Sequence, residues 1–218
     1  MTRPLVSSAL LLAALAAAWQ PSKALAAEED TQLWHFVFAT GEIGPGTRLT
    51  LDASHRWREE ARGGDVQTVR FTIEQDVADD LRLGGGAAVF EAGGKTELRP
   101  HQQVIFTKGG FEARTRLEQR FFDGADRMEL RLRQRLQYIH PLGRGWRAHV
   151  GAEWLGLLQS RRADGDAGTE LWIAQTGVAY KINDRLDISA NYWLLAFPNG
   201  DSPARFSHVP QTMLIYHF

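Results

Sequence analysis

The chain has 218 residues, of which 44% are hydrophobic and 23% charged, and its mean hydropathy is −0.30. This composition excludes a helical membrane protein and an intrinsically disordered chain. The absence of cysteine excludes disulfides, thiolate metal sites and cysteine nucleophiles. The formal net charge is −1, so we expect no nucleic-acid partner.

The first 26 residues have the pattern of a secretory signal peptide. Arg3 gives a positive start, residues 5–18 form an apolar run, and Ala24-Leu25-Ala26 is a small-x-small cleavage site. The apolar run is shorter than the about 20 residues that a membrane-spanning helix needs. We therefore expect export and cleavage after Ala26. Residues 27–46 are then an N-terminal segment with one strand-like stretch, at 32–40.

From residue 47 onward, polar and apolar residues alternate with a period of two, and no segment has a convincing helical period. This alternation is typical of β-strands with one polar and one apolar face. It predicts ten strands, at 47–58, 68–77, 81–90, 98–106, 111–121, 128–138, 146–158, 170–182, 185–194 and 208–218. The three glycines at 84–86 indicate a bend or a close approach of strands, and Pro100 interrupts the fourth strand.

The connections between these strands alternate in length. Tight turns are predicted at 79–80, 108–110, 143–145 and 183–184, and longer polar loops at 59–65, 92–95, 122–127, 159–169 and 197–205. Short turns at one end and long loops at the other are typical of an outer-membrane β-barrel, with the turns in the periplasm. A soluble β-sandwich is the alternative.

Aromatic residues near the predicted strand ends favour the barrel, because membrane barrels carry aromatic girdles at both interfaces. They are Trp57, Phe106, Phe121, Tyr138, Trp146, Trp172, Tyr180, Tyr192 and Tyr216. The expected fold is therefore an antiparallel transmembrane β-barrel of about ten strands over residues 47–218.

Strand parity leaves one alternative open. Ten strands bring both ends of the barrel to the periplasmic side, as bacterial barrels require. The stretch at 32–40, with Trp34, Phe36 and Phe38 on one face, adds an eleventh strand-like segment. Either it belongs to a barrel of twelve strands or it lies outside or inside a barrel of ten.

The last residues indicate how such a barrel reaches its membrane. The final segment alternates and ends in Tyr216, His217 and Phe218. A terminal aromatic strand is similar to the signal that the barrel-assembly machinery recognises, so Tyr216 and Phe218 are the candidate assembly signal. The expected location is the outer membrane of a Gram-negative bacterium, with outer-membrane lipid as a partner.

Two adjacent predicted strands carry a motif of alternating arginines. The strands are Arg116-Leu117-Glu118-Gln119-Arg120-Phe121 and Arg131 to Tyr138, the second followed by Pro141-Leu142. With the early Leu33-Trp34, this pattern resembles the bacterial family called domain of unknown function 2490. The resemblance covers essentially the mature chain and departs at His140, before the proline. It implies an outer-membrane barrel and carries no established activity, so it assigns no catalytic residue.

The polar faces of the strands would form the interior of the barrel. They carry fifteen Arg or Lys and nine Asp or Glu residues, whereas the chain without residues 1–26 has 23 basic and 26 acidic residues. The candidate lumen residues are Arg114, Arg116, Glu118, Arg120, Glu129, Arg131, Arg133, Arg135, Arg147 and Glu153.

These residues fit three functions. The Arg and Glu side chains could neutralise one another in a structural barrel without transport. The excess arginines could instead line a narrow channel that prefers small anionic solutes.

The third function is a lipid-modifying hydrolase with a serine and a histidine. However, Ser54 and His55, like Ser207 and His208, are adjacent in sequence and point to opposite faces of a strand. His149 and Glu153 share a face but lie roughly 13 Å apart. No catalytic residue, metal or cofactor is therefore expected.

Overall fold

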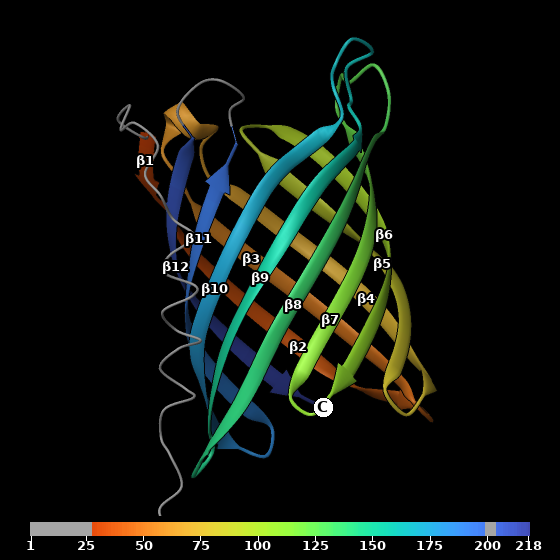
Figure 1. Cartoon of the computed structure of the whole chain (residues 1–218), viewed down its shortest axis with the longest axis vertical. Helices are drawn as coiled ribbons and strands as arrows, with labels where there is room; N and C mark the ends of the chain where they lie inside the picture. The colour runs from red at the N-terminus through yellow and green to blue at the C-terminus, as the bar shows by residue number, and fades with distance from the viewer. Residues whose placement is uncertain (1–27, 199–203) are drawn as a thin grey trace, which may run out of the picture.

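The computed structural model describes residues 28–198 and 204–218, so the expected signal peptide at 1–26 and part of the expected loop at 197–205 lie outside the described residues. Twelve strands account for most of this part of the chain (Figure 1). They are β1 (Glu28–Thr31), β2 (Leu33–Gly44), β3 (Thr47–Trp57), β4 (Val66–Ala78), β5 (Leu81–Ala92), β6 (Lys95–Lys108), β7 (Phe111–Phe122), β8 (Glu129–Gly143), β9 (Trp146–Gln159), β10 (Gly168–Asn183), β11 (Leu186–Phe197) and β12 (Arg205–His217).

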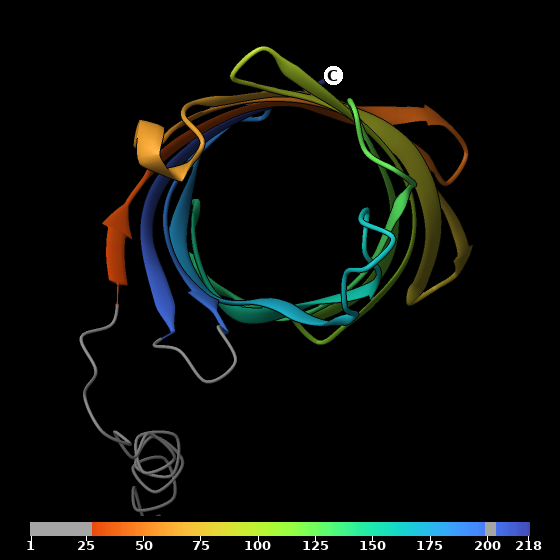
Figure 2. The same ribbon diagram turned by 90° about the horizontal axis from the view of Figure 1, so that it is seen from above.

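The strands form one closed barrel, seen end-on in Figure 2. Consecutive strands from β2 to β12 pair in antiparallel fashion, and β12 returns to pair with β2 in parallel, from Gln211 opposite Trp34 to His217 opposite Thr40. The all-β barrel expected from the alternation is confirmed. The ten strands predicted from residue 47 onward correspond to β3–β12.

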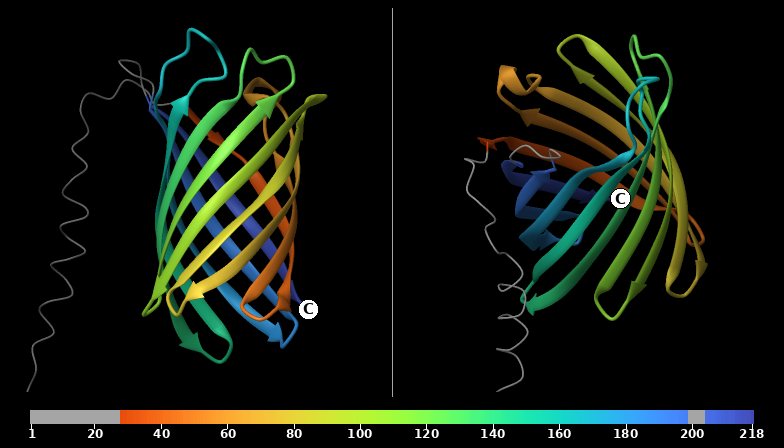
Figure 3. Two further views of the ribbon diagram at one scale, coloured as in Figure 1. Left: turned by 90° about the vertical axis from the view of Figure 1, so that its right-hand side faces the viewer. Right: turned by 45° about the horizontal axis from the view of Figure 1, so that its top comes forward.

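The closed barrel has eleven strands, one more than the ten counted from residue 47 onward, because β2 is also a barrel strand. Neither the ten-stranded nor the twelve-stranded alternative is correct. β1 extends the N-terminal strand along β12, with Glu28 opposite Arg205 and Thr31 opposite His208. The odd count places residue 28 and residue 218 at opposite ends of the barrel (Figures 1 and 3).

The two ends of the barrel differ in their connections. Five two-residue turns at 45–46, 79–80, 109–110, 144–145 and 184–185 lie at one end, called the turn end below. The other end, the loop end, carries the segment at 58–65 with the short 3-10 helix Glu60–Arg62, and the loops at 123–128 and 160–167. The expected longer loop at 92–95 is wrong, because Gly93 and Gly94 form a tight turn with positive φ angles of 57° and 75°.

The outer surface of the barrel is mostly apolar. Large side chains that face outward include Val37, Leu51, Val69, Leu136 and Val150, each at least 46% exposed. Aromatic residues lie near both ends of this surface. Those toward the turn end include Phe106, Phe111, Tyr138, Trp146, Tyr180 and Tyr216, and those toward the loop end include Trp57, Phe121, Trp154 and Trp172.

Gly86 and Pro100 each affect strand packing or pairing locally. A Cβ atom at Gly86 would lie 2.0 Å from the backbone oxygen of Phe71, so β5 approaches β4 too closely there for a side chain. Strand β6 is continuous, so Pro100 does not break it. The register of β6 with β7 nevertheless lacks pairs at Arg99 and Pro100, since proline has no N–H to donate.

Within the described residues, no helix is long and apolar enough to cross a membrane.

Candidate functional site: the charged lumen

A cavity of about 1640 Å³ occupies the interior of the barrel. Its lining includes Arg62 and Asp164 at the loop end, and Thr40, Glu112 and Arg147 next to the turns at the other end. Eighteen of the lining side chains are Arg or Lys and eight are Asp or Glu. Four further carboxylates, those of Asp52, Glu118, Glu129 and Asp187, are buried behind this lining. The interior still has an excess of positive charge and reaches toward both ends of the barrel.

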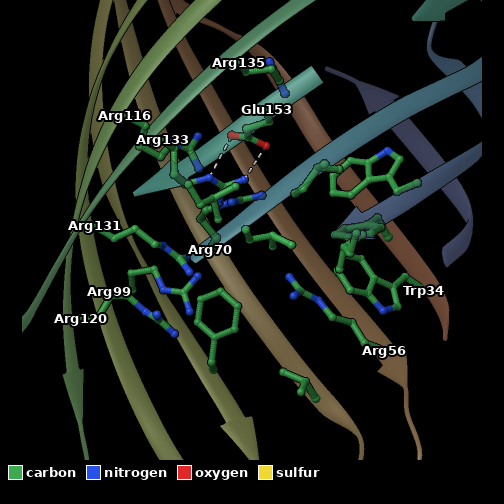
Figure 4. Close-up of a pocket in the computed structure, with 18 of the residues that line it drawn as sticks. Trp34, Arg56, Arg70, Arg99, Arg116, Arg120, Arg131, Arg133, Arg135 and Glu153 are labelled. Atoms are coloured by element: carbon green, nitrogen blue, oxygen red, sulfur yellow. Dashed lines mark hydrogen bonds and ion pairs between the residues drawn. The ribbon is translucent and has the colours of Figure 1, made fainter. Parts of the chain in front are cut away.

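Period-two alternation turns one face of each strand inward, and the ten candidate lumen residues all lie on inward faces of β7, β8 and β9. Eight of them line the cavity, whereas Glu118 and Glu129 are buried in the wall behind it. Figure 4 shows Arg116, Arg131 and Arg133 on this side of the lumen. The inward side chains of β6, β7 and β8, together with Glu153 of β9, are called the charged wall below.

Two buried glutamates organise the middle of the charged wall. Glu118, 1% exposed, accepts hydrogen bonds from Arg131 at 2.6 and 2.8 Å and from Arg133 at 3.1 Å. Glu153, also 1% exposed, accepts two from Arg133 at 2.8 and 2.9 Å and one from Arg114 at 2.8 Å. Arg133 thus bridges both carboxylates through its planar guanidinium, which holds each in a fixed position.

A second cluster lies nearer the loop end. Arg99 and Arg120 each donate two hydrogen bonds to Glu97, at distances between 2.6 and 3.1 Å. Arg120 also pairs with Glu129. Glu170, which we did not predict as a lumen residue, accepts from Arg131 at 3.0 Å and so joins this cluster to the first.

Toward the turn end the charged groups pair singly. Arg147 donates to Asp187 at 2.7 Å, Arg135 pairs with Glu112, and Arg70 donates two hydrogen bonds to Asp52. These contacts neutralise most lumen carboxylates with the nearest arginine.

Arg116 differs from these arginines. It donates two hydrogen bonds to the amide oxygen of Gln103, at 2.6 and 2.8 Å, and within the described residues it forms no salt bridge. Its charge is therefore solvated by an amide and not cancelled by a carboxylate.

The lumen also contains an apolar region that the sequence did not reveal. Polar residues were expected on every inward face, but a buried cluster on β2 and β9–β12 points into the barrel. Its members, called the apolar wall below, are Trp34, Phe36, Leu155, Leu171, Ile173, Leu195 and Val209. Phe38, Trp193, Phe197 and Met213 pack against it. Trp34, Phe36 and Phe38 all point inward, so the aromatic face of the stretch at 32–40 lines the lumen.

The sequence contains one signal for this wall. Strand β11 has the run Trp193-Leu194-Leu195, and β9 has Trp154-Leu155. Consecutive apolar residues in a strand mean that both of its faces are apolar, because neighbouring side chains point to opposite sides. An interpretation that assumes strict alternation assigns the whole run to the outward face, and it misses the residues of the run that point inward.

The candidate serine and histidine residues for hydrolysis lie on opposite sides of the wall or contact other partners. Ser54 is buried on the inner side while His55 binds Asp65 outside, and Ser207 binds Asp30 while His208 contacts Tyr192. Among the hydrogen bonds of the described residues, none joins a serine hydroxyl to a histidine ring.

The loops at 123–128 and 160–167 form part of the mouth at the loop end, and both project beyond the strands in Figure 1. Arg127 connects them by donating to the backbone oxygens of Ser160 and Arg162, at 2.9 and 3.1 Å. The hydrogen bond from the Arg162 guanidinium lowers the pKa of the exposed Asp164 carboxyl below its usual range. The mouth therefore carries charged groups of both signs.

A sequence model of the family described as "Protein of unknown function (DUF2490)" matches residues 31–194. Comparison with curated proteins gives no match. The matched range extends from β1 into β11 and includes both arginine-rich strands of the charged wall.

Proposed function

The chain belongs to the DUF2490 family, which carries no described activity, and we propose that it is an outer-membrane barrel whose lumen conducts small anions. The observation that carries this proposal is the excess of eighteen cationic over eight anionic side chains along a cavity that reaches toward both ends. A charged lining of one sign raises the local concentration of ions of the opposite sign.

The apolar outer surface supports the membrane part of the proposal. An outward band of Val, Leu and Phe side chains costs free energy in water and is stabilised by lipid. Aromatic side chains near both ends match the interfacial girdles of membrane barrels. Tyr216 on β12 and Phe218 just after it are 42% and 52% exposed, so the barrel-assembly machinery could bind them during insertion.

The conduction proposal is tested by recordings of the purified protein in planar bilayers under a salt gradient. We expect current steps whose reversal potential indicates a preference for chloride over potassium. Replacing Arg116 by Gln should lower the anion-to-cation permeability ratio about twofold, because this removes a lumen charge without leaving a carboxylate unpaired. Arg185→Gln, at an exposed turn, should leave the ratio unchanged. Cation-selective steps, or an Arg116→Gln ratio equal to that of the parent, would contradict the proposal.

A second function, a structural barrel without transport, is favoured by a different observation. Glu118 and Glu153 are nearly inaccessible and are clamped by three arginines, an arrangement that fills part of the interior with fixed side chains. Folded protein that inserts into the bilayer and passes no current would establish this alternative instead of conduction.

A further inference from the structure

Arg56, which β3 directs into the lumen, has no counter-ion. Within the described residues it forms no salt bridge, and its Nε atom is buried without a hydrogen-bond partner. Four other arginines, Arg58, Arg70, Arg99 and Arg133, line the same cavity. A buried or half-buried charge is costly unless an opposite charge or several acceptors compensate it.

Three aromatic rings lie close to the guanidinium of Arg56. Its Cζ atom lies 4.3 Å from the ring centroid of Trp34, 5.5 Å from that of Phe90 and 5.9 Å from that of Phe36. Cation–π contacts compensate part of the charge but supply no hydrogen-bond acceptor. The Nε atom is buried, and the other donors of Arg56, whose side chain lines the cavity, form no hydrogen bond with the described residues (Figure 4).

The surroundings of Arg56 indicate what a ligand at this position would look like. Trp34 and Phe36 belong to the apolar wall, while Phe90 belongs to a second small apolar cluster with Val66 and Ala88. A ligand that pairs with Arg56 would therefore place the rest of its structure against apolar and aromatic side chains. A strongly hydrated inorganic anion would gain nothing from these surfaces, whereas an apolar body would be stabilised by leaving water.

We propose that the lumen binds amphipathic organic anions, with the anionic group paired to Arg56 and an apolar body packed against the lumen side of the apolar wall. The cavity of about 1640 Å³ is large enough for such a molecule, since binding pockets for small ligands usually measure about 300–1,000 Å³. The inference deepens the proposed function by naming the class of anion that the lumen selects.

The test is equilibrium binding to the folded protein in lipid nanodiscs, with empty nanodiscs as the blank. The probe is 2-naphthoate, which carries both a carboxylate and an aromatic body. Acetate carries the charge alone and 2-naphthamide carries the body alone. We expect 2-naphthoate to bind at least about tenfold more tightly than either, because only it satisfies Arg56 and the apolar wall together.

Variants of the protein locate the site. Arg56→Gln should weaken 2-naphthoate binding about tenfold or more, and Arg56→Lys should restore part of the affinity because it keeps the charge. Arg185→Gln is the matched control, an exposed arginine at the turn end, and should bind as the parent does. Equal affinity for 2-naphthoate and 2-naphthamide, or an Arg56→Gln variant that binds as tightly as the parent, would overturn the inference.

Binding is measured without any current, so the two proposals can fail separately. Protein that binds 2-naphthoate through Arg56 but passes no ions retains this inference and loses conduction. Anion-selective current without Arg56-dependent binding retains conduction and removes the amphipathic ligand.

Discussion

Glu118 and Glu153 are the residues on which the charged wall depends, because each accepts hydrogen bonds from two arginines while almost fully buried. Replacing a buried ion pair by apolar groups is often neutral, but removing one partner leaves an uncompensated charge and is strongly destabilising. The arginines that remain would then face one another across the strand pair β7–β8.

We expect Glu118→Gln to lower the free energy of unfolding by about 3 kcal/mol, because Arg131 and Arg133 both lose a charged acceptor. The measurement is denaturant unfolding in detergent micelles, followed by heat-modifiable gel migration. Asp164→Asn is the control, since it breaks an exposed Arg–Asp pair in a loop and should leave the midpoint unchanged. A Glu118→Gln midpoint equal to that of the control would show that the network contributes nothing to stability.

At the scale of the element, the parallel seam between β12 and β2 closes the barrel. Every other neighbouring pair from β2 to β12 is antiparallel and consecutive in the chain, whereas β2 and β12 come from opposite ends of the chain. Val37 lies opposite Leu214 in this seam, and Leu214 lies opposite Ile188 on β11.

Cysteine pairs test the seam directly, because the natural chain contains no cysteine. Neighbouring strands lie about 4.8 Å apart, within the range that a disulfide bridges, and strands two positions apart lie about twice as far. We expect Val37→Cys with Leu214→Cys to cross-link under mild oxidation and shift in a non-reducing gel. Val37→Cys with Ile188→Cys should remain reduced. A ten-stranded barrel would pair β12 with β3 and would leave the first pair reduced too.

At the scale of the whole molecule, the odd number of strands separates the two ends of the described chain. Residue 28 lies with the long loops and Phe218 lies with the two-residue turns. With its turns in the periplasm, an outer-membrane barrel of these eleven strands would expose its long loops and the start of β1 to the outside of the cell, and it departs in this from the even strand count of bacterial barrels.

Labelling of intact cells with a membrane-impermeant maleimide tests both location and orientation. We expect Asp164→Cys, in the exposed loop at 160–167, to be labelled in intact cells. Asp184→Cys, in an exposed turn at the other end, should react only after the outer membrane is permeabilised. The reverse pattern would place the loops in the periplasm, and labelling of both residues in intact cells would contradict a membrane location with this orientation.

Much of this architecture was predictable because strand alternation is a local property. Each of the strands β3–β12 corresponds to a predicted segment, and the inward positions of Arg131 and Arg133 follow from their parity alone. Alternation assumes, however, that the two faces of a strand differ in polarity. Leu155 and Leu195 lie on strands where both faces are apolar, so the apolar wall was not predicted.

The sequence alone determined the fold class, most of the turns and loops, and the inward faces of the arginine-rich strands, because these depend on neighbours within one strand. Only the tertiary structure decided how the barrel closes and which charges meet. Pairing of β2 with β12 joins segments about 175 residues apart, and no local pattern encodes that contact. Trp34 and Arg56 are opposite each other in the local β2–β3 hairpin, whereas only the folded barrel brings Phe90 of β5 within 5.5 Å of the same guanidinium.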